Sequence, residues 1–121
     1  MRFDYDDQNI FAKILRGEIP NKTVLETEHS LAFNDIAPQA PVHVLVIPKG
    51  AYMSYDHFAR EASDAEILDF NRTVAQVCET AGVDEGFRAI ANARAHGVQE
   101  VPHFHMHILG GRPLGRMLER G

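Results

Sequence analysis

The sequence lacks several features that define common classes of protein. It has a single cysteine, Cys78, which cannot form an internal disulfide, so we expect a reducing compartment, the cytoplasm. No apolar run approaches the roughly 20 residues that a membrane-spanning helix needs. The start, MRFDYDDQNIFAKIL, carries three acidic residues and no small-residue cleavage site. We therefore expect neither an export signal nor a membrane association.

Basic residues are also scarce. Twelve Lys and Arg stand against 17 Asp and Glu, for a formal net charge of −5, and no basic block occurs. Long nucleic acids are poor ligands for such a chain, because many phosphates must be neutralised to hold them. A single nucleotide needs only a few local donors, so the charge excludes the polymer and not the monomer. No repeats or linker-like stretches occur, and we expect one continuous domain over residues 1–121.

The apolar pattern predicts an α+β domain with five strands and two helices. Strands are expected over residues 23–27, 30–35, 42–48, 87–92 and 103–110, bounded by turn residues. Helices are expected over residues 6–16 and 63–81, the second opening on the capping-box pattern SDAE. The connection 51–62 has no assigned structure. Short links between the strands favour a mostly antiparallel sheet.

The most unusual segment is HFHMHILG, which places His103, His105 and His107 at alternate positions. On a strand, alternate residues share one face, so the three imidazoles would line a cleft while the apolar residues between them pack on the other side. A buried imidazole needs partners for two nitrogens, and histidine has no special preference for strands. The segment therefore calls for a chemical explanation.

Three interpretations are open from these residues alone. The histidines could be the polar side of a half-exposed strand. Two of them could bind zinc with a third ligand from elsewhere, but His103 and His107 would lie too far apart to share an ion, at ~6.6 Å per alternate residue. Cys78 lies on the apolar stripe of a helix, where a buried structural role fits better than metal binding. The third interpretation makes the central His105 a nucleophile toward phosphorus, flanked by two groups that handle protons and oxygens. It is the only one that uses all three histidines.

Three blocks of sequence resemble the Hint-type branch of the histidine triad (HIT) family. They are IFAKILRGEIP (10–20), LAFNDIAPQAPVHVLVIPK (31–49) and HFHMHILGGRPLG (103–115). The resemblance implies a HIT-like fold and an enzyme that cleaves P–N bonds of purine nucleoside 5′-phosphoramidates, such as AMP joined to an amine. It further implies a covalent nucleotidyl-histidine intermediate, with no metal and no cofactor.

The resemblance implies a role for each matching histidine. His105 would be the nucleophile, His107 would contact the phosphate and assist the leaving group, and His103 would support the arrangement. His43 matches a fourth histidine that points into the same site from a neighbouring strand. Taken by itself, His43 alternates with valines and could equally be an exposed strand residue.

The resemblance also implies a nucleotide pocket. Asp35 would accept hydrogen bonds from the ribose hydroxyls, and Asn92 would lie near the phosphate. Without the resemblance, Asp35 could be a turn residue and Asn92 an ordinary residue at the end of a strand. Five apolar residues are expected in the core, and some of them are expected to wall a slot for the flat base: Phe11, Ile14, Phe33, Ile36 and Leu45.

The loop before the histidines departs from the family pattern. Gln99 and Glu100 are expected at the substrate, but many relatives carry Ser or Thr where Glu100 stands and glycine where Val98 stands. If that backbone needs a positive φ, a valine there is strained. A carboxylate at Glu100 would repel the phosphate, so we expect a changed preference for the leaving group.

The family resemblance implies a two-fold homodimer that joins two sheets, with the tail 112–121 close to the partner's site. The apolar stripe of helix 63–81 is wider than one sheet face demands, which agrees with a dimer. Two other functions use the same residues: a nucleotide-binding interaction protein with incidental hydrolysis, and a zinc-binding domain.

Overall fold

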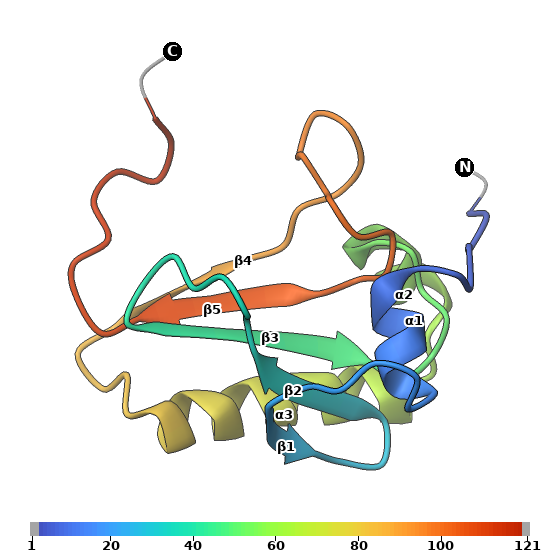
Figure 1. Cartoon of the computed structure of the whole chain (residues 1–121), viewed down its shortest axis with the longest axis horizontal. Helices are drawn as coiled ribbons and strands as arrows, with labels where there is room; N and C mark the ends of the chain where they lie inside the picture. Colours follow the sequence, from blue (N-terminus) through green and yellow to red (C-terminus); the bar gives the residue numbers. More distant parts are fainter. Residues whose placement is uncertain (1–2, 120–121) are drawn as a thin grey trace.

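Residues 3–119 are described by a computed structural model, and their five strands form an antiparallel sheet in the order β1-β2-β3-β5-β4 (Figure 1). The strands are β1 (Thr23–Glu26), β2 (Ser30–Asn34), β3 (Val42–Pro48), β4 (Phe87–Ile90) and β5 (Met106–Gly110). Each neighbouring pair is antiparallel. The α+β class and the antiparallel sheet are confirmed.

Three helices accompany the sheet in residues 3–119, where two were expected. They are α1 (Ile10–Leu15), α2 (Tyr55–Glu61) and α3 (Asp64–Ala81). The additional helix, α2, lies in the connection 51–62, and seven residues are too few to show a helical period in the sequence. The first helix begins at Ile10 rather than at residue 6, because Asn9 caps it by accepting the amide of Ala12 at 2.9 Å. No helix in this part of the chain is both long and apolar enough to cross a membrane.

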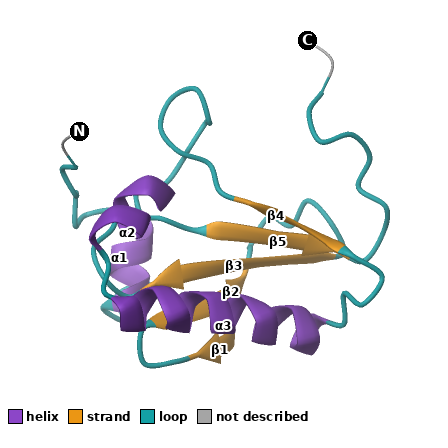
Figure 2. Cartoon of the chain, turned by 180° about the vertical axis from the view of Figure 1, so that it is seen from behind, coloured by secondary structure: helices purple, strands orange, loops and turns teal. Residues whose placement is uncertain are grey.

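The capping box of α3 is confirmed. The amide of Glu66 donates to the Ser63 hydroxyl at 3.1 Å, and the amide of Ser63 donates to the Glu66 carboxylate at 3.0 Å. The helix ends at Gly82, whose φ of 67° is a left-handed conformation that glycine adopts without strain. Between these two caps α3 lies along one face of the sheet (Figure 2).

Alternation along the strands divides the core into two layers. The face under α3 carries one apolar cluster that includes Ala32, Val44, Val46, Phe70, Val77, Phe104 and Ile108. The opposite face, on which α1 lies, carries a second cluster: Phe11, Leu31, Phe33, Leu45 and Ile47. By the same alternation His43 and His107 belong to the α1 face, since Leu45 lies between His43 and Ile47 on β3 and pairs with His107 on β5.

The last strand begins at Met106, so the expected strand 103–110 is too long by three residues. The pairing of β3 with β5 runs only to Val46 and Met106. Beyond that pair the backbone turns away to the segment before α2, where the Phe104 amide donates to the Tyr52 carbonyl at 2.7 Å. The carbonyl of Pro48 is bonded by the imidazole of His103 at 2.8 Å. The first two histidines are therefore held by an irregular segment and only His107 by the sheet.

The loop before β5 has the strained backbone that its sequence suggested. Val98 has φ 55° and Arg94 has φ 58°, both in the left-handed region. Arg94 forms a two-pronged ion pair with Asp56, with N···O distances of 2.9 and 3.0 Å. Val98 is branched at Cβ and exposed. The expectation of a costly valine at this position is confirmed.

Replacing Val98 by glycine should therefore stabilise the protein. Left-handed strain costs on the order of 1–3 kcal/mol, and the added entropy of glycine in the unfolded chain costs about 0.4–1 kcal/mol. We expect Val98→Gly to raise the free energy of unfolding in urea by between about 0 and 2.6 kcal/mol, the difference between these two terms. The matched control is Val24→Gly in β1, which has no positive φ, packs against the core and should lower stability. Destabilisation by Val98→Gly would contradict the strain.

Candidate active site

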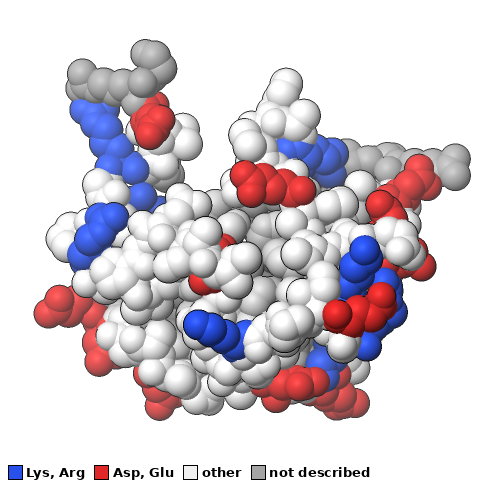
Figure 3. Space-filling model, viewed as in Figure 1, with Lys and Arg blue, Asp and Glu red and all other residues white. Residues whose placement is uncertain are grey.

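A cavity of about 560 Å³ opens on the α1 face of the sheet. Its apolar lining includes residues of α1, β2 and β3, and its polar lining consists of Asn34, Asp35, Gln39, Asn92, Glu100, His105 and His107. Figure 3 shows mainly uncharged side chains across the centre of this face, with charged ones mostly toward its margin. The volume and the mixed lining suit a small organic ligand with one polar end.

All five apolar residues expected at a base slot line this cavity. Phe11, Phe33 and Leu45 are also buried core residues, so the expectation of a core position is confirmed for them. Ile36 is different, because 93% of it is exposed. The core interpretation is wrong for Ile36, which stands on the loop after β2 where no element covers it.

His105 is held in one orientation by its own backbone neighbourhood. Its Nδ1 lies 2.8 Å from the carbonyl oxygen of His103, and a carbonyl only accepts, so the proton is on Nδ1. The neutral ring then carries its lone pair on Nε2. Burial lowers the pKa of His105, although the bond to His103 and the charges of Asp35 and Glu100 act in the opposite direction. The edge-on ring of Phe11, with centroids 5.0 Å apart, supports this imidazole.

His107 is oriented by a chain of hydrogen bonds that begins in the loop 37–41. The amide of Gln39 donates to Nδ1 of His43 at 3.1 Å, which places the proton of His43 on Nε2. That Nε2–H donates to Nδ1 of His107 at 2.9 Å, which places the proton of His107 on its own Nε2. Burial is the main cause that lowers the pKa of His107 to about 4. His107 is therefore a neutral N–H donor in the cavity, complementary to the lone pair of His105.

His43 is only 3% exposed, so the exposed-strand interpretation of it is wrong. It does not line the cavity itself and acts on it through His107. Burial lowers its pKa, and the carboxylate of Asp35, 3.4 Å away, opposes that shift.

Asp35 is a turn residue and also a cavity residue. One of its oxygens accepts the amide of Ala37 at 2.8 Å, as the turn interpretation expected. The other oxygen lies at the polar end of the cavity, beside His43. Asn92 also lines the cavity, but it follows β4 rather than ending it, since β4 stops at Ile90.

The loop 94–100 contributes Glu100 to the cavity but not Gln99. The Gln99 side-chain amide donates to the carbonyls of Met53 and Val101 at 2.6 and 2.9 Å, and its oxygen accepts the amide of Arg94 at 3.1 Å. Gln99 therefore does not line the cavity, and its side-chain polar atoms hold the loop. The Arg94 guanidinium lowers the pKa of Asp56 to about 2, so this second anchor stays ionised.

Three side chains could be considered as metal ligands: Asp35, His43 and His107, with ligand atoms within 4.8 Å of one another. These are not the two alternate histidines that a zinc site was expected to use. Nε2 of His43 would have to bind the ion, which would leave the proton on Nδ1. The Gln39 amide already donates to that Nδ1, and a neutral imidazole cannot accept at both nitrogens. The hydrogen-bond chain therefore opposes a metal at this cluster.

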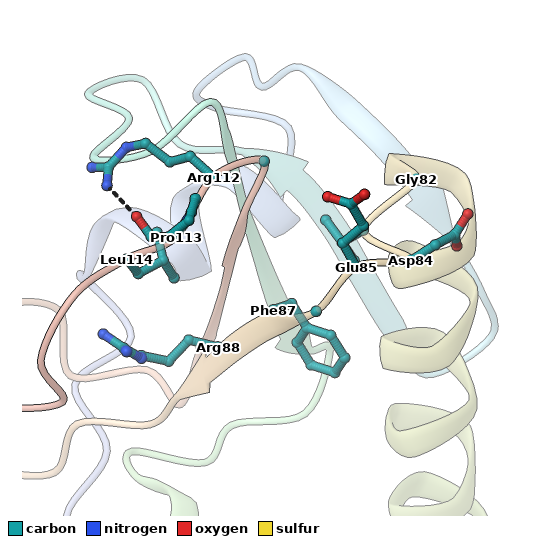
Figure 4. A pocket seen from close by; sticks show the side chains of 11 residues that line it. Gly82, Asp84, Glu85, Phe87, Arg88, Arg112, Pro113 and Leu114 are labelled. Carbon is teal, nitrogen blue, oxygen red and sulfur yellow. Dashed lines mark hydrogen bonds between the residues drawn. The ribbon is translucent and has the colours of Figure 1, made fainter.

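A second cavity, of about 750 Å³, lies beyond β4 and is lined by residues 82–88 and 111–114 (Figure 4). Its two arginines donate to carbonyls of the C-terminal segment, Arg88 to Gly115 at 2.8 Å and Arg112 to Pro113 at 2.8 Å. Its lining contains no imidazole and no thiol. The two arginines of this cavity bind the backbone of the C-terminal segment. The imidazoles of His105 and His107 line the smaller cavity, of about 560 Å³.

Two residues that orient the histidines were not expected from the sequence. Gln39 acts through its backbone amide, for which a sequence carries no signal beyond its spacing from His43. Tyr5 donates its hydroxyl proton to His103 across 98 positions of chain, at 2.6 Å. His103 itself is fully buried and does not line the cavity, contrary to the expectation that all three histidines do.

Comparison with known proteins gives a consistent result. The family model of the HIT domain matches residues 16–114. An uncharacterised HIT-like protein of Azospirillum brasilense is 55% identical over 118 residues, covering 97% of each chain. The purine nucleoside phosphoramidase of Escherichia coli K12 is 42% identical over 113 residues, covering 93% of this chain and 94% of the relative.

Solved structures agree with this result. A HIT family hydrolase from Clostridium thermocellum superposes with a TM-score of 0.81 at 34% identity, covering 93% of this chain and 99% of that one. The five-stranded antiparallel sheet of the present chain, and its histidine segment that leads into β5, lie within the residues that the family model matches. The chain belongs to the histidine triad family.

Proposed function

We propose that this protein is a purine nucleoside phosphoramidase, which hydrolyses the P–N bond between a nucleoside 5′-monophosphate and an amine. The observation that carries the proposal is the bond from His105 Nδ1–H to the carbonyl of His103, because it presents a bare Nε2 in a nucleotide-sized cavity. The phosphoramidase of Escherichia coli, 42% identical over nearly the whole chain, supports the same reaction.

The cavity provides a place for each part of such a substrate. The flat base fits the apolar wall of Phe11, Phe33 and Leu45. Asp35 accepts hydrogen bonds from the ribose hydroxyls, as a carboxylate at the polar end can. The phosphate then lies at His105 and His107, with Asn92 beside it.

In the first step the lone pair of His105 Nε2 attacks phosphorus, and the P–N bond breaks as the N–P bond forms. The amine nitrogen takes up one proton, which comes from solvent through the open cavity, as it leaves. His107 keeps its own proton and donates a hydrogen bond from Nε2–H to the departing nitrogen. The nucleotidyl-imidazole carries a positive charge, with its Nδ1–H still bonded to the His103 carbonyl. The carboxylates of Asp35 and Glu100 stabilise that charge in this proposal; their raising effect on the pKa of His105, which burial outweighs, supports this role.

In the second step water attacks phosphorus and releases His105. The oxygen of water forms a bond to phosphorus. One of the two water protons returns to solvent and makes up for the proton taken from solvent in the first step. The other proton binds the released amine, which becomes an ammonium ion. The products are the nucleoside monophosphate and the protonated amine. The exposed side chain of Glu100 sits at the cavity lining, and we infer that it favours cationic over anionic leaving groups.

An interaction protein that binds nucleotides without useful turnover would need the cavity but not the hydrogen-bond chains. A bare Nε2 on one imidazole and an N–H on its neighbour favour the enzyme. We place the enzyme in the cytoplasm, where the Cys78 thiol stays reduced; burial raises the pKa of Cys78, which keeps the thiol protonated and poorly reactive.

We also propose that two copies join edge to edge along β4, which pairs only with β5 within the part of the chain that the structure describes. An open edge offers unpaired backbone groups to a second strand, and Phe87 on this edge is 49% exposed. Arg88 holds the tail beside the edge through the carbonyls of Gly115 and Arg116. The proposed position of the tail 112–121 near the partner's site includes residues 120–121, which lie outside the described residues.

Replacing the nucleophile tests the reaction directly. His105→Ala should lower kcat for an adenosine phosphoramidate at least about 1000-fold, because no other neutral nucleophile lines the cavity. The control is His96→Ala, an exposed loop histidine outside the cavity, which should keep wild-type turnover. Acid-quenched single turnovers, followed by mass spectrometry, should detect a nucleotidyl group on the wild-type peptide that contains His105. Near-normal turnover by His105→Ala would refute the assignment.

The pH dependence of kcat/KM follows from the shifted pKa values. The reaction needs neutral His105, and lowering its pKa extends the neutral form to lower pH. We therefore expect kcat/KM to stay level from pH 8 to below 6.5 and to fall only as the pH approaches the lowered values, of which that of His107 is about 4. Spontaneous hydrolysis of the substrate at each pH is the control. An acid limb with its midpoint at or above the ordinary histidine value of 6.5 would contradict the buried, neutral site.

Light scattering at micromolar concentration tests the proposed dimer. The expected mass is twice that of the 13.5 kDa chain. Phe87→Lys places a charge on the β4 edge and should shift the mass toward the monomer, whereas Thr23→Lys, on the opposite edge strand β1, should not. A monomeric wild type would rule out the dimer.

A further inference from the structure

His103 poses a question that the proposed reaction leaves open. Its side chain is fully buried and does not line the cavity, so it cannot touch a substrate there. Its backbone carbonyl, however, accepts the Nδ1–H of His105 at 2.8 Å. Whatever fixes the position of residue 103 therefore fixes the orientation of the nucleophile.

Two hydrogen bonds hold the His103 ring from opposite sides. Nε2 lies 2.8 Å from the carbonyl of Pro48, so Nε2 carries the proton. Nδ1 is then an acceptor, and the hydroxyl of Tyr5 lies 2.6 Å from it. Burial lowers the pKa of His103 to about 4, so the ring is neutral and cannot donate from both nitrogens. Tyr5 is therefore the donor.

Tyr5 is itself well fixed as that donor. Burial raises the pKa of Tyr5 above its ordinary value, so the hydroxyl keeps its proton. Its ring packs edge-on to His103, with centroids 5.6 Å apart. Two residues earlier Phe3 stacks on His57 of α2, with centroids 4.4 Å apart and planes 6° from parallel. The N-terminal segment is thus attached to the rest of the protein through Phe3 as well as through Tyr5.

We propose that Tyr5 is a positioning residue for the nucleophile. Its hydroxyl holds the ring of His103, the ring holds the backbone at that position, and the carbonyl holds His105 with Nε2 bare toward the cavity. The inference rests on the proposed function for its effect on turnover. The effect of Tyr5 on the His105 tautomer is independent of the reaction and can be measured on the protein without substrate.

Removing the hydroxyl would leave a buried acceptor on His103 without its donor. The ring can then recover a partner only by turning or by admitting water, and either change moves the carbonyl that His105 bonds. A shift of this kind costs rate rather than affinity, because it misaligns the attacking nitrogen while the nucleotide pocket stays intact. Tyr5 is accordingly expected to affect kcat and not KM.

The experiment compares Tyr5→Phe with Thr73→Val in the full chain. Thr73 is the matched control because it also donates a buried hydroxyl, to the carbonyl of Asp69 at 2.8 Å, and lies in α3 on the opposite face of the sheet from the cavity. For Tyr5→Phe we expect kcat toward an adenosine phosphoramidate to fall about tenfold, with KM changed by less than about twofold. Thr73→Val should keep both constants, even if its melting temperature falls.

Nitrogen-15 NMR of the histidine rings supplies the second measurement. In the wild type His105 should show Nδ1–H and bare Nε2, and in Tyr5→Phe a fraction of the other tautomer should appear. Unchanged kcat in Tyr5→Phe overturns the proposal, and so does a fall in kcat without a change at His105, because Tyr5 would then act by another route. A wild type that lacks turnover would refute the phosphoramidase function, and the tautomer signals alone would then decide whether Tyr5 controls His105.

Discussion

The site depends on one hydrogen bond, from Nδ1–H of His105 to the carbonyl of the residue two positions before it. An imidazole in water exchanges its proton between two nitrogens, and only one of the two tautomers has a lone pair toward the cavity. A backbone carbonyl cannot donate, so the bond selects that tautomer without any titratable partner. Because the acceptor belongs to an irregular segment rather than to a ladder of β5, its position has to be maintained from outside the sheet. Tyr5, Pro48 and the Phe104–Tyr52 backbone bond all act at this one place.

The second requirement is that the buried imidazoles stay neutral. Burial lowers the pKa of each of the four histidines around the site, and bonds to backbone groups, rather than ion pairs, set most of their proton positions. Among residues 3–119 the charged groups that line the cavity are carboxylates, and no Lys or Arg of these residues lines it. In the proposed reaction this cavity would meet the phosphate with N–H dipoles and would favour a positive charge on His105. A site built on lysine or arginine would bind the phosphate more strongly before reaction and would stabilise the charged intermediate less.

The loop before β5 shows how strain and anchoring are balanced around such a site. Val98 holds a left-handed backbone that a branched residue adopts only at a cost. Arg94 forms an ion pair with Asp56 in α2, and Gln99 donates to the carbonyl of Met53 just before α2, so the loop is held at two points. That tie places Glu100 at the cavity wall, where its charge reaches His105. The segment before α2 also accepts the amide of Phe104 at the Tyr52 carbonyl. The loop 94–100 and the segment that holds His105, the proposed nucleophile, are therefore both bonded to residues 52–53.

Much of this protein follows from the order of its residues. The period-two apolar pattern predicted the five strands and the antiparallel α+β fold, the SDAE box predicted the start of the long helix, and the alternating histidines with the flanking blocks predicted the family. Local rules work there because each depends on neighbours within a few positions. They failed for α2, which is too short to show a period, for the extent of β5, and for Ile36, which was expected in the core but which no element of the tertiary structure covers. The sequence by itself determined which side chains are the candidates for the proposed chemistry, whereas only the tertiary structure decided which nitrogen of each imidazole bears its proton. The donors and acceptors that select it, in Tyr5, Gln39, Pro48 and His43, are brought to the histidines by folding.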